Sequence, residues 1–201
     1  MRFAYADPPY PGQASRHYKH HADYGGEVDH RALIERLMDE FADGWALSTS
    51  EAALKDVLEL VPRGTPSRKN KGRYLNGTGV RILAWCKPNA PWMPVNPQFG
   101  WEPVLLYGGR RSAGQPPVRN WLVCSPQGYT WRPRPPGHIT GAKPPEFCRW
   151  VFRALGARPD DQLVDLFPGS GAVQRAWETF EAQPELVVVD QLAFAEASDD
   201  A

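Results

Sequence analysis

Residues 163–171 read LVDLFPGSG, an apolar run that ends in an acidic residue and a Gly-x-Gly turn. The run predicts a buried strand through residue 167, and residues 171–182 predict a helix that begins at the turn. Glycines in such a turn let the main chain approach a ligand closely, and the first turn of the helix has free N–H groups. The stretch therefore predicts a ligand-binding loop between a strand and a helix.

An acidic residue also follows the next apolar run, residues 186–189. This residue is Asp190, which stands 25 residues after Asp165. In nucleotide-binding folds, a carboxylate at about this spacing holds the ribose hydroxyls of the ligand. The alternative interpretation is a surface aspartate that ends a strand.

A second turn, ADPPY at residues 6–10, follows the short apolar run at residues 3–6. Two consecutive prolines fix φ and lack N–H groups, so they form a rigid corner that leaves carbonyl groups unpaired. The corner would hold the side chains of Asp7 and Tyr10 in place. Because both turns follow strands, we expect them at the same edge of one sheet. An ordinary turn at the end of a strand is the alternative.

Strands and helices alternate along the rest of the chain. This alternation is typical of an α/β fold with a mostly parallel, Rossmann-like sheet that has helices on both faces. Strands are expected at residues 3–6, 45–49, 80–85, 104–107, 121–124, 163–167 and 186–189, and helices at residues 29–41, 50–60, 144–156 and 171–182. Asp29 and Ser50 are the expected N-caps of the first two helices.

Length and composition fit one domain with a sizeable core. The chain has 201 residues, of which 42% are hydrophobic and 23% charged. It contains no apolar run near the ~18 residues of a membrane span, and no leader-like segment opens it, so we expect a cytoplasmic protein. The histidines of residues 15–21, SRHYKHH, lack a fourth ligand at a suitable spacing, so no metal is expected. Three cysteines without CxxC spacing argue against a disulfide framework: Cys86, Cys124 and Cys148.

The net charge of zero hides a strongly basic segment. Residues 63–134 contain twelve Lys or Arg residues and one acidic residue, Glu102, which gives this segment a net charge of +11. Such a block is typical of a surface that binds a polyanion, because each cation placed on a phosphate releases counterions. A solvated loop is the alternative. The candidate nucleic-acid contacts are Arg63, Arg68, Lys69, Lys71, Arg73, Arg110, Arg111, Arg119, Arg132 and Arg134.

The two turns, in this order, resemble the S-adenosylmethionine-dependent amino-methyltransferases of nucleic acids. Because DPPY comes first, the resemblance is to the permuted, or beta, group, in which the catalytic half precedes a target-recognition insertion and the cofactor half. The segments WCKPN (85–89), WEPVLLY (101–107) and TGAKP (140–144) extend it along the chain. It implies a catalytic half at residues 1–109 with a basic loop at 62–79, an insertion at 110–137, a cofactor half at 138–192 and a tail at 193–201.

The resemblance also implies roles for individual residues. Asp7 and the carbonyl of Pro8 would hold the amino hydrogens of the target base, Pro9 would keep the corner rigid, and Tyr10 would stack on the base. S-adenosylmethionine is the implied cofactor. Its expected binding residues are Ala6, Lys143, Asp165, Phe167, Pro168, Gly169, Ser170, Gly171 and Asp190.

The implied substrate is adenine N6 in DNA, since DPPY accompanies adenine and the Ser-led version of the motif accompanies cytosine N4. A duplex buries the amino group, so the base must flip out while basic residues hold phosphates. The short insertion predicts a recognition sequence of roughly two to five base pairs. The alternatives are an RNA adenine, cytosine N4, or a silent nucleic-acid-binding module on the same fold. The sequence predicts no oligomeric state.

Overall fold

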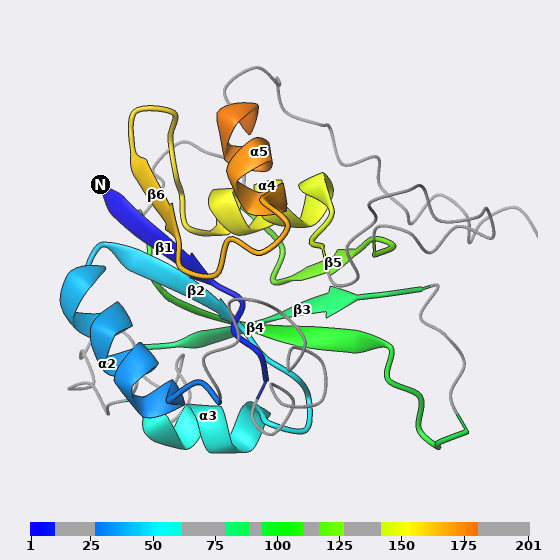
Figure 1. The fold of residues 1–201 in the computed structure, drawn as a ribbon. Helices are drawn as coiled ribbons and strands as arrows, with labels where there is room; N and C mark the ends of the chain where they lie inside the picture. Colours follow the sequence, from blue (N-terminus) through cyan, green and yellow to red (C-terminus); the bar gives the residue numbers. More distant parts are fainter. Residues whose placement is uncertain (11–26, 62–78, 89–93, 111–116, 127–141, 181–201) are drawn as a thin grey trace, which may run out of the picture.

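The computed structural model describes residues 1–10, 27–61, 79–88, 94–110, 117–126 and 142–180 (Figure 1). Within these ranges strands and helices follow one another in the predicted order, with three successive strands between the second and third helices. In chain order the elements are β1 (Arg2–Ala6), α2 (His30–Glu40), β2 (Gly44–Ser48), α3 (Leu54–Leu60), β3 (Arg81–Cys86), β4 (Trp101–Gly108), β5 (Trp121–Val123), α4 (Pro145–Ala154), β6 (Gln162–Asp165) and α5 (Ala172–Glu178).

The strands form a six-stranded sheet in the order β5-β3-β4-β2-β1-β6. Strand β1 is parallel to both of its neighbours, β2 and β6, and β3 is parallel to β5. Strand β4 is antiparallel to β2 and to β3, between which it lies. All strands of the sheet except β4 therefore run in one direction, which confirms the predicted mostly parallel α/β fold.

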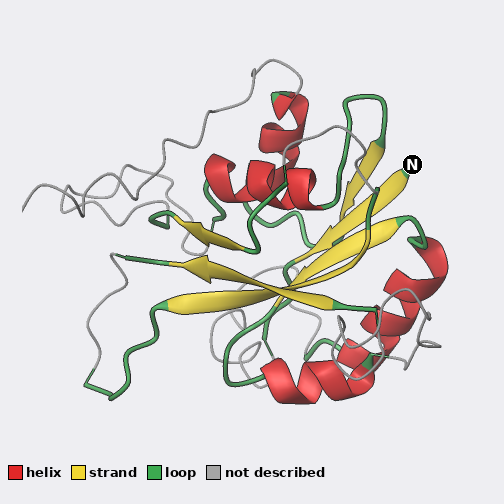
Figure 2. Cartoon of the chain, turned by 180° about the vertical axis from the view of Figure 1, so that it is seen from behind, coloured by secondary structure: helices red, strands yellow, loops and turns green. Residues whose placement is uncertain are grey.

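Helices cover both faces of the sheet. Helices α4 and α5 lie on one face and α2 and α3 on the other (Figures 1 and 2). Successive side chains of a strand point to opposite faces, so Phe3 and Tyr5 join the core under α4 while Ala4 and Ala6 join the core under α2. No helix in the described ranges is both long enough and apolar enough to cross a membrane.

The first predicted helix begins where the sequence indicates. The side chain of Asp29 accepts hydrogen bonds from the N–H groups of Arg31 and Ala32, which satisfies two donors of the first turn of α2. Helix α3 differs from the prediction, because it begins at Leu54 and not directly after Ser50. The hydroxyl of Ser50 accepts a hydrogen bond from the N–H of Ala53, 3.2 Å away, and so holds the turn that precedes this helix.

The end of β6 also differs from the prediction. The strand stops at Asp165, two residues before Phe167, because the N–H of Phe167 donates to Oδ1 of Asp165 at 3.1 Å and turns the chain out of the sheet. Helix α5 ends at Glu178. The strand predicted at 186–189, Asp190 and the tail lie outside the described residues.

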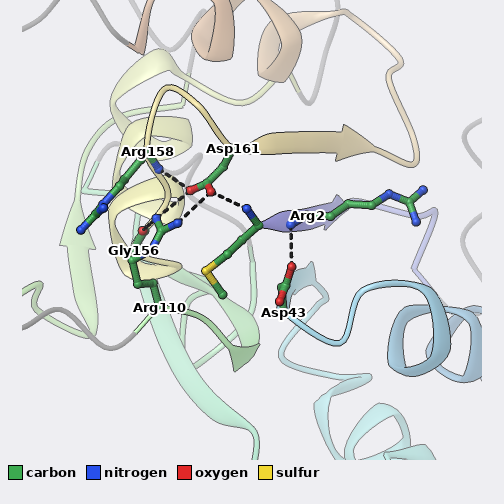
Figure 3. A network of polar contacts seen from close by, with 7 residues as sticks. Arg2, Asp43, Arg110, Gly156, Arg158 and Asp161 are labelled. Carbon is green, nitrogen blue, oxygen red and sulfur yellow. Dashed lines mark hydrogen bonds and ion pairs between the residues drawn. The ribbon is translucent and has the colours of Figure 1, made fainter.

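A buried carboxylate in the segment before β6 forms ion pairs with the amino group that precedes β1 and with an arginine that follows β4 (Figure 3). Asp161, whose side chain is 1% exposed, accepts from the amino group of Met1 at 2.7 Å and from two nitrogens of Arg110 at 2.7 and 2.8 Å. The N–H of Arg158 also donates to it at 2.7 Å. These hydrogen bonds, chiefly those from Arg110, hold the pKa of Asp161 well below its usual range.

Candidate active site

The two turns that the sequence singles out lie side by side. Strands β1 and β6 are adjacent and parallel, with Tyr5 opposite Asp165, so the loops that follow them leave the same edge of the sheet. The N–H of Leu166 donates to the carbonyl of Tyr5 at 2.9 Å, which continues the pairing past the end of β6. The parallel pairing therefore brings ADPPY and the glycine turn together, as the sequence predicts.

The carboxylate at the end of β6 has one satisfied oxygen and one unsatisfied oxygen. Oδ1 of Asp165 accepts from the N–H of Phe167, whereas Oδ2 is buried and has no hydrogen-bond partner in the described part of the chain. Burial raises the pKa of Asp165, against the effect of the Phe167 N–H. A buried acceptor without a donor is unfavourable. A ligand that brings an N–H or O–H group to Oδ2 would remove that penalty.

The turn after Asp165 requires glycine at two positions. Gly169 and Gly171 have φ values of +41° and +67°, in the left-handed region that L side chains rarely adopt. The N–H of Gly171 donates to the carbonyl of Pro168 at 2.6 Å and closes the turn. The hydroxyl of Ser170 accepts from the N–H of Ala172, the first residue of α5, at 3.3 Å. These contacts fix the path of the main chain beside Asp165.

The carboxylate of the other turn, Asp7, forms an ion pair. Nζ of Lys143 lies 2.9 Å from Oδ2 of Asp7, and the two side chains are 7% and 23% exposed respectively. Burial raises the pKa of Asp7, Lys143 opposes that rise, and Glu102 adds to it. Burial would lower the pKa of Lys143, but the surrounding acidic groups, first Asp7, raise it well above its usual value. Lys143 therefore remains a cation next to Asp7.

A second carboxylate, Glu102 at the start of β4, joins this ion pair. Its Oε2 accepts a hydrogen bond from the hydroxyl of Tyr10 at 3.2 Å and lies 3.6 Å from Nζ of Lys143. Its Oε1 contacts Nζ of Lys87, the residue that directly follows β3. Burial would raise the pKa of Glu102, but Lys143 and Lys87 together lower it. We call Asp7, Lys143, Glu102, Lys87 and Tyr10 the charged cluster.

Sequence reasoning assigned no role to Glu102 or Lys87 in the site. Two signals were available: both residues lie in segments that carry the resemblance, WCKPN and WEPVLLY, and Glu102 is the one acid within a basic segment. Neither signal shows where the two side chains point. For Lys143, the resemblance implies a cofactor contact, whereas the structure places its ammonium group against Asp7 and Glu102. The rings of Trp85 and Phe147 flank that ammonium group at 5.5 and 5.9 Å from their centroids.

The structure describes few of the candidate nucleic-acid contacts. Both terminal nitrogens of the Arg110 guanidinium group donate to the carboxylate of Asp161, so this pair of donors is already used within the protein. That of Arg119 lies 5.0 Å from the ring centroid of Trp121, which is 40% exposed. Phosphate binding by the basic segment stays a prediction. Eight candidates lie outside the described residues: Arg63, Arg68, Lys69, Lys71, Arg73, Arg111, Arg132 and Arg134.

Two of the cysteines, Cys124 and Cys148, do not have the character of nucleophiles. All three are free thiols, and Cys124 and Cys148 are buried. Burial raises the pKa of Cys124 to about 11 and that of Cys148 to about 12. Since the thiolate is the reactive form, these two side chains act as core residues. The histidines at 17, 20 and 21 lie outside the described residues.

The fold has counterparts among solved structures. No protein-family model matches the chain, and no curated protein matches it. The crystal structure of the M1.HpyAVI-SAM complex has a TM-score of 0.55 and 14% sequence identity, over 90% of this chain and 78% of that chain. The crystal structure of M1.HpyAVI has a TM-score of 0.48 and 12% identity, over 90% and 76%. The likeness to the first structure confirms the predicted Rossmann-like fold.

Proposed function

We propose that the protein is an S-adenosylmethionine-dependent methyltransferase that acts on the exocyclic amino group of a nucleic-acid base. The observation that carries the proposal is the pairing of β1 with β6, which brings Asp7 and Asp165 to one edge of the sheet on neighbouring loops. The loop after β1 presents acceptors that suit an amino group. The loop after β6 presents a glycine turn beside Asp165, whose buried Oδ2 has no hydrogen-bond partner among the described residues. The fold likeness to a complex of M1.HpyAVI with SAM supports the choice of cofactor.

The residues of the glycine turn fit this cofactor. S-adenosylmethionine carries an ammonium group, ribose hydroxyls and an adenine amino group, and any of these donors would satisfy Oδ2 of Asp165. Residues 165–171 and Ala6 would hold it, with Asp190 as a further contact for the ribose. When bound, it supplies an electrophilic methyl group attached to a sulfonium sulfur.

The DPPY turn would prepare the acceptor nitrogen. An exocyclic amino group is a weak nucleophile because its lone pair is delocalised into the ring. Asp7 and the carbonyl of Pro8 would accept its two hydrogens and orient the lone pair, and the rigid corner of Pro8 and Pro9 would hold both acceptors in place. Tyr10 would stack on the base while Glu102 accepts a hydrogen bond from the tyrosine hydroxyl and holds the ring in place. Alignment and electrostatics would thus supply most of the acceleration.

The proposed target is adenine N6 in DNA. The basic segment suits a polyanion, and Asp at position 7 favours adenine through the resemblance described above. A carboxylate would also accept from the amino group of cytosine, so the acceptor chemistry alone does not distinguish the two bases.

Product analysis tests the proposal. The protein is incubated with S-adenosylmethionine labelled in its methyl group and with DNA or RNA of mixed sequence, and the digested nucleosides are identified by mass spectrometry. We expect labelled N6-methyladenine from DNA, and on the order of 100- to 1,000-fold slower labelling with the Asp7→Asn variant. N4-methylcytosine, or label in RNA alone, would overturn the choice of target. Binding of nucleic acid without any transfer would instead identify a silent binding module.

A further inference from the structure

We propose that Glu102 is a positioning residue that couples the two polar side chains of the DPPY turn, holding Tyr10 directly and Asp7 through Lys143. The inference rests on the proposed function and adds a residue to its site. Glu102 belongs to β4, the antiparallel strand, so neither the strand that carries DPPY nor the strand that carries the glycine turn supplies it.

Both oxygens of Glu102 are used within the site. Oε2 accepts from the hydroxyl of Tyr10 at 3.2 Å and also attracts Nζ of Lys143 at 3.6 Å. Oε1 is held by Nζ of Lys87, whose side chain is 16% exposed. Three partners around one carboxylate leave it little rotational freedom. The ring of Tyr10 is therefore anchored at its hydroxyl end as well as through the proline corner.

Lys143 transmits the effect of Glu102 to Asp7. Its Nζ lies 2.9 Å from Oδ2 of Asp7 and 3.6 Å from Oε2 of Glu102, so one ammonium group lies between two carboxylates. The attraction of Glu102 opposes a closer approach of Lys143 to Asp7. Lys143 engages Oδ2 of Asp7. In the proposed mechanism Oδ1 would accept a hydrogen of the amino group.

The charges of the cluster balance, two ammonium groups against two carboxylates. All four side chains are largely buried, with exposures between 7% and 23%. Unbalanced charge at such sites is costly, because little water is available to solvate it. Without the charge of Glu102, two lysines would face Asp7 alone. Glu102 is also the one acidic residue between Arg63 and Arg134, and its side chain lies in this cluster.

Glu102→Gln tests the coupling, since it removes the charge and keeps the shape and an acceptor for Tyr10. Glu59→Gln, at an exposed position of α3, is the matched control. We expect Glu102→Gln to lower kcat about 10- to 100-fold, as a misplaced catalytic group does, with donor affinity close to that of the wild type. Its melting temperature should fall, because one ammonium group of the cluster loses its balancing charge, so kcat is measured well below the unfolding transition. Combined with Tyr10→Phe, it should lower kcat by less than the product of the two single effects. An unchanged kcat, or fully multiplicative effects, would overturn the inference.

A titration of Asp7 supplies a readout that does not depend on activity. The charged groups that act on Asp7 are Lys143, Glu102 and Lys87. Asp7 in turn acts on Tyr5, Tyr10, Asp165 and Cys148, which also face this region. Followed by NMR of ¹³C-labelled aspartate carboxyls, Asp7 should titrate at lower pH in Glu102→Gln, since a neighbouring negative charge is lost. No shift, or the same shift in Glu59→Gln, would overturn the inference.

An inactive wild type and an unfolded Glu102→Gln variant have different consequences for the role of Glu102. If the wild type transfers no methyl group, the proposed function fails, whereas the titration still shows whether Glu102 acts on Asp7. If Glu102→Gln does not fold, Glu102→Asp keeps the charge and withdraws it by one methylene, and it should fold with a reduced kcat and a wild-type melting temperature. Failure of both variants to fold would make Glu102 a structural residue and overturn the inference.

Discussion

Nζ of Lys143 lies 2.9 Å from Oδ2 of Asp7, and both side chains are largely buried. Lys143 precedes α4, whereas Asp7 follows β1, so the contact joins the proposed cofactor half of the chain to its proposed catalytic half. The ion pair means that Asp7, the proposed acceptor for the base, is held by the same part of the chain that carries the glycine turn.

The first prediction concerns Asp7. We expect Asp7→Asn to lower kcat on the order of 100- to 1,000-fold, because the amide replaces an anionic acceptor at the reacting amino group. Donor affinity, measured by calorimetry, should stay within a few fold, since residues 165–171 are assigned to the donor. Asp56→Asn, exposed on α3, is the control. Retained turnover by Asp7→Asn would remove Asp7 from the proposed mechanism.

The second prediction concerns the pH dependence of kcat. Burial raises the pKa of Asp7, so activity should be lost on acidification at a higher pH than an ordinary aspartate would give. Lys143 opposes that rise, so Lys143→Met should move the acid limb to still higher pH, the opposite direction to Glu102→Gln. Lys55→Met, whose side chain is 84% exposed on α3, should leave the profile in place. An acid limb that does not move in Lys143→Met would contradict the role of this ion pair.

The third prediction concerns the glycine turn. Gly171 has a φ of +67°, where an L side chain costs about 1–2 kcal/mol and a β-branched one more. The added Cβ would also lie 2.9 Å from Nη1 of Arg175, which can move away, so the backbone strain decides the result. Gly171→Val should weaken donor binding about tenfold or more in calorimetry. Gly100→Val, where a Cβ meets no atom within 4 Å, should bind the donor normally.

The fourth prediction concerns stability. Asp161→Asn should lower the free energy of unfolding by about 3 kcal/mol, because it leaves the guanidinium of Arg110 without its buried anion. Urea unfolding measures it, with exposed Asp160→Asn as the control. The pKa of Asp161 is depressed in the folded state, so its stabilisation is present above the unfolded-state pKa and is lost as the pH falls through the folded-state pKa. Equal stability of the two variants at neutral pH would show that the ion pair contributes little.

The fifth prediction concerns the basic segment. Replacing Arg68, Lys69 and Lys71 together by Gln should weaken DNA binding and leave the methylated sequence unchanged, because phosphate contacts position and base contacts specify. Each lost contact should reduce the slope of log K against log salt by about 0.9. Fluorescence anisotropy at several salt concentrations measures the slope. The same slope in the triple variant would make this segment an ordinary solvated surface.

Local sequence determined most of the elements of this fold. The Asp29 cap and the spacing of Leu33, Ile34 and Leu37 located α2, because capping and periodicity act within a few residues. The two turns were identified for the same reason, since proline and glycine restrict or free the main chain where they stand. The boundaries of α3 and β6 were wrong by a few residues, because hydrogen bonds from Ala53 and Phe167 to nearby side chains competed with the regular pattern.

The tertiary structure alone decided the order of the strands and the charged cluster. A strand pattern shows which side chains share a face but not which strands become neighbours, so the antiparallel place of β4 between β2 and β3 was not predicted. That placement brings Glu102 to Tyr10, 92 residues away in sequence. Contacts between residues far apart in sequence depend on how the sheet and helices pack as a whole, so a local sequence pattern does not predict them. Local sequence thus determined the ADPPY turn and the glycine turn. The packing of the whole fold brought Lys143, Glu102 and Lys87 next to the ADPPY turn.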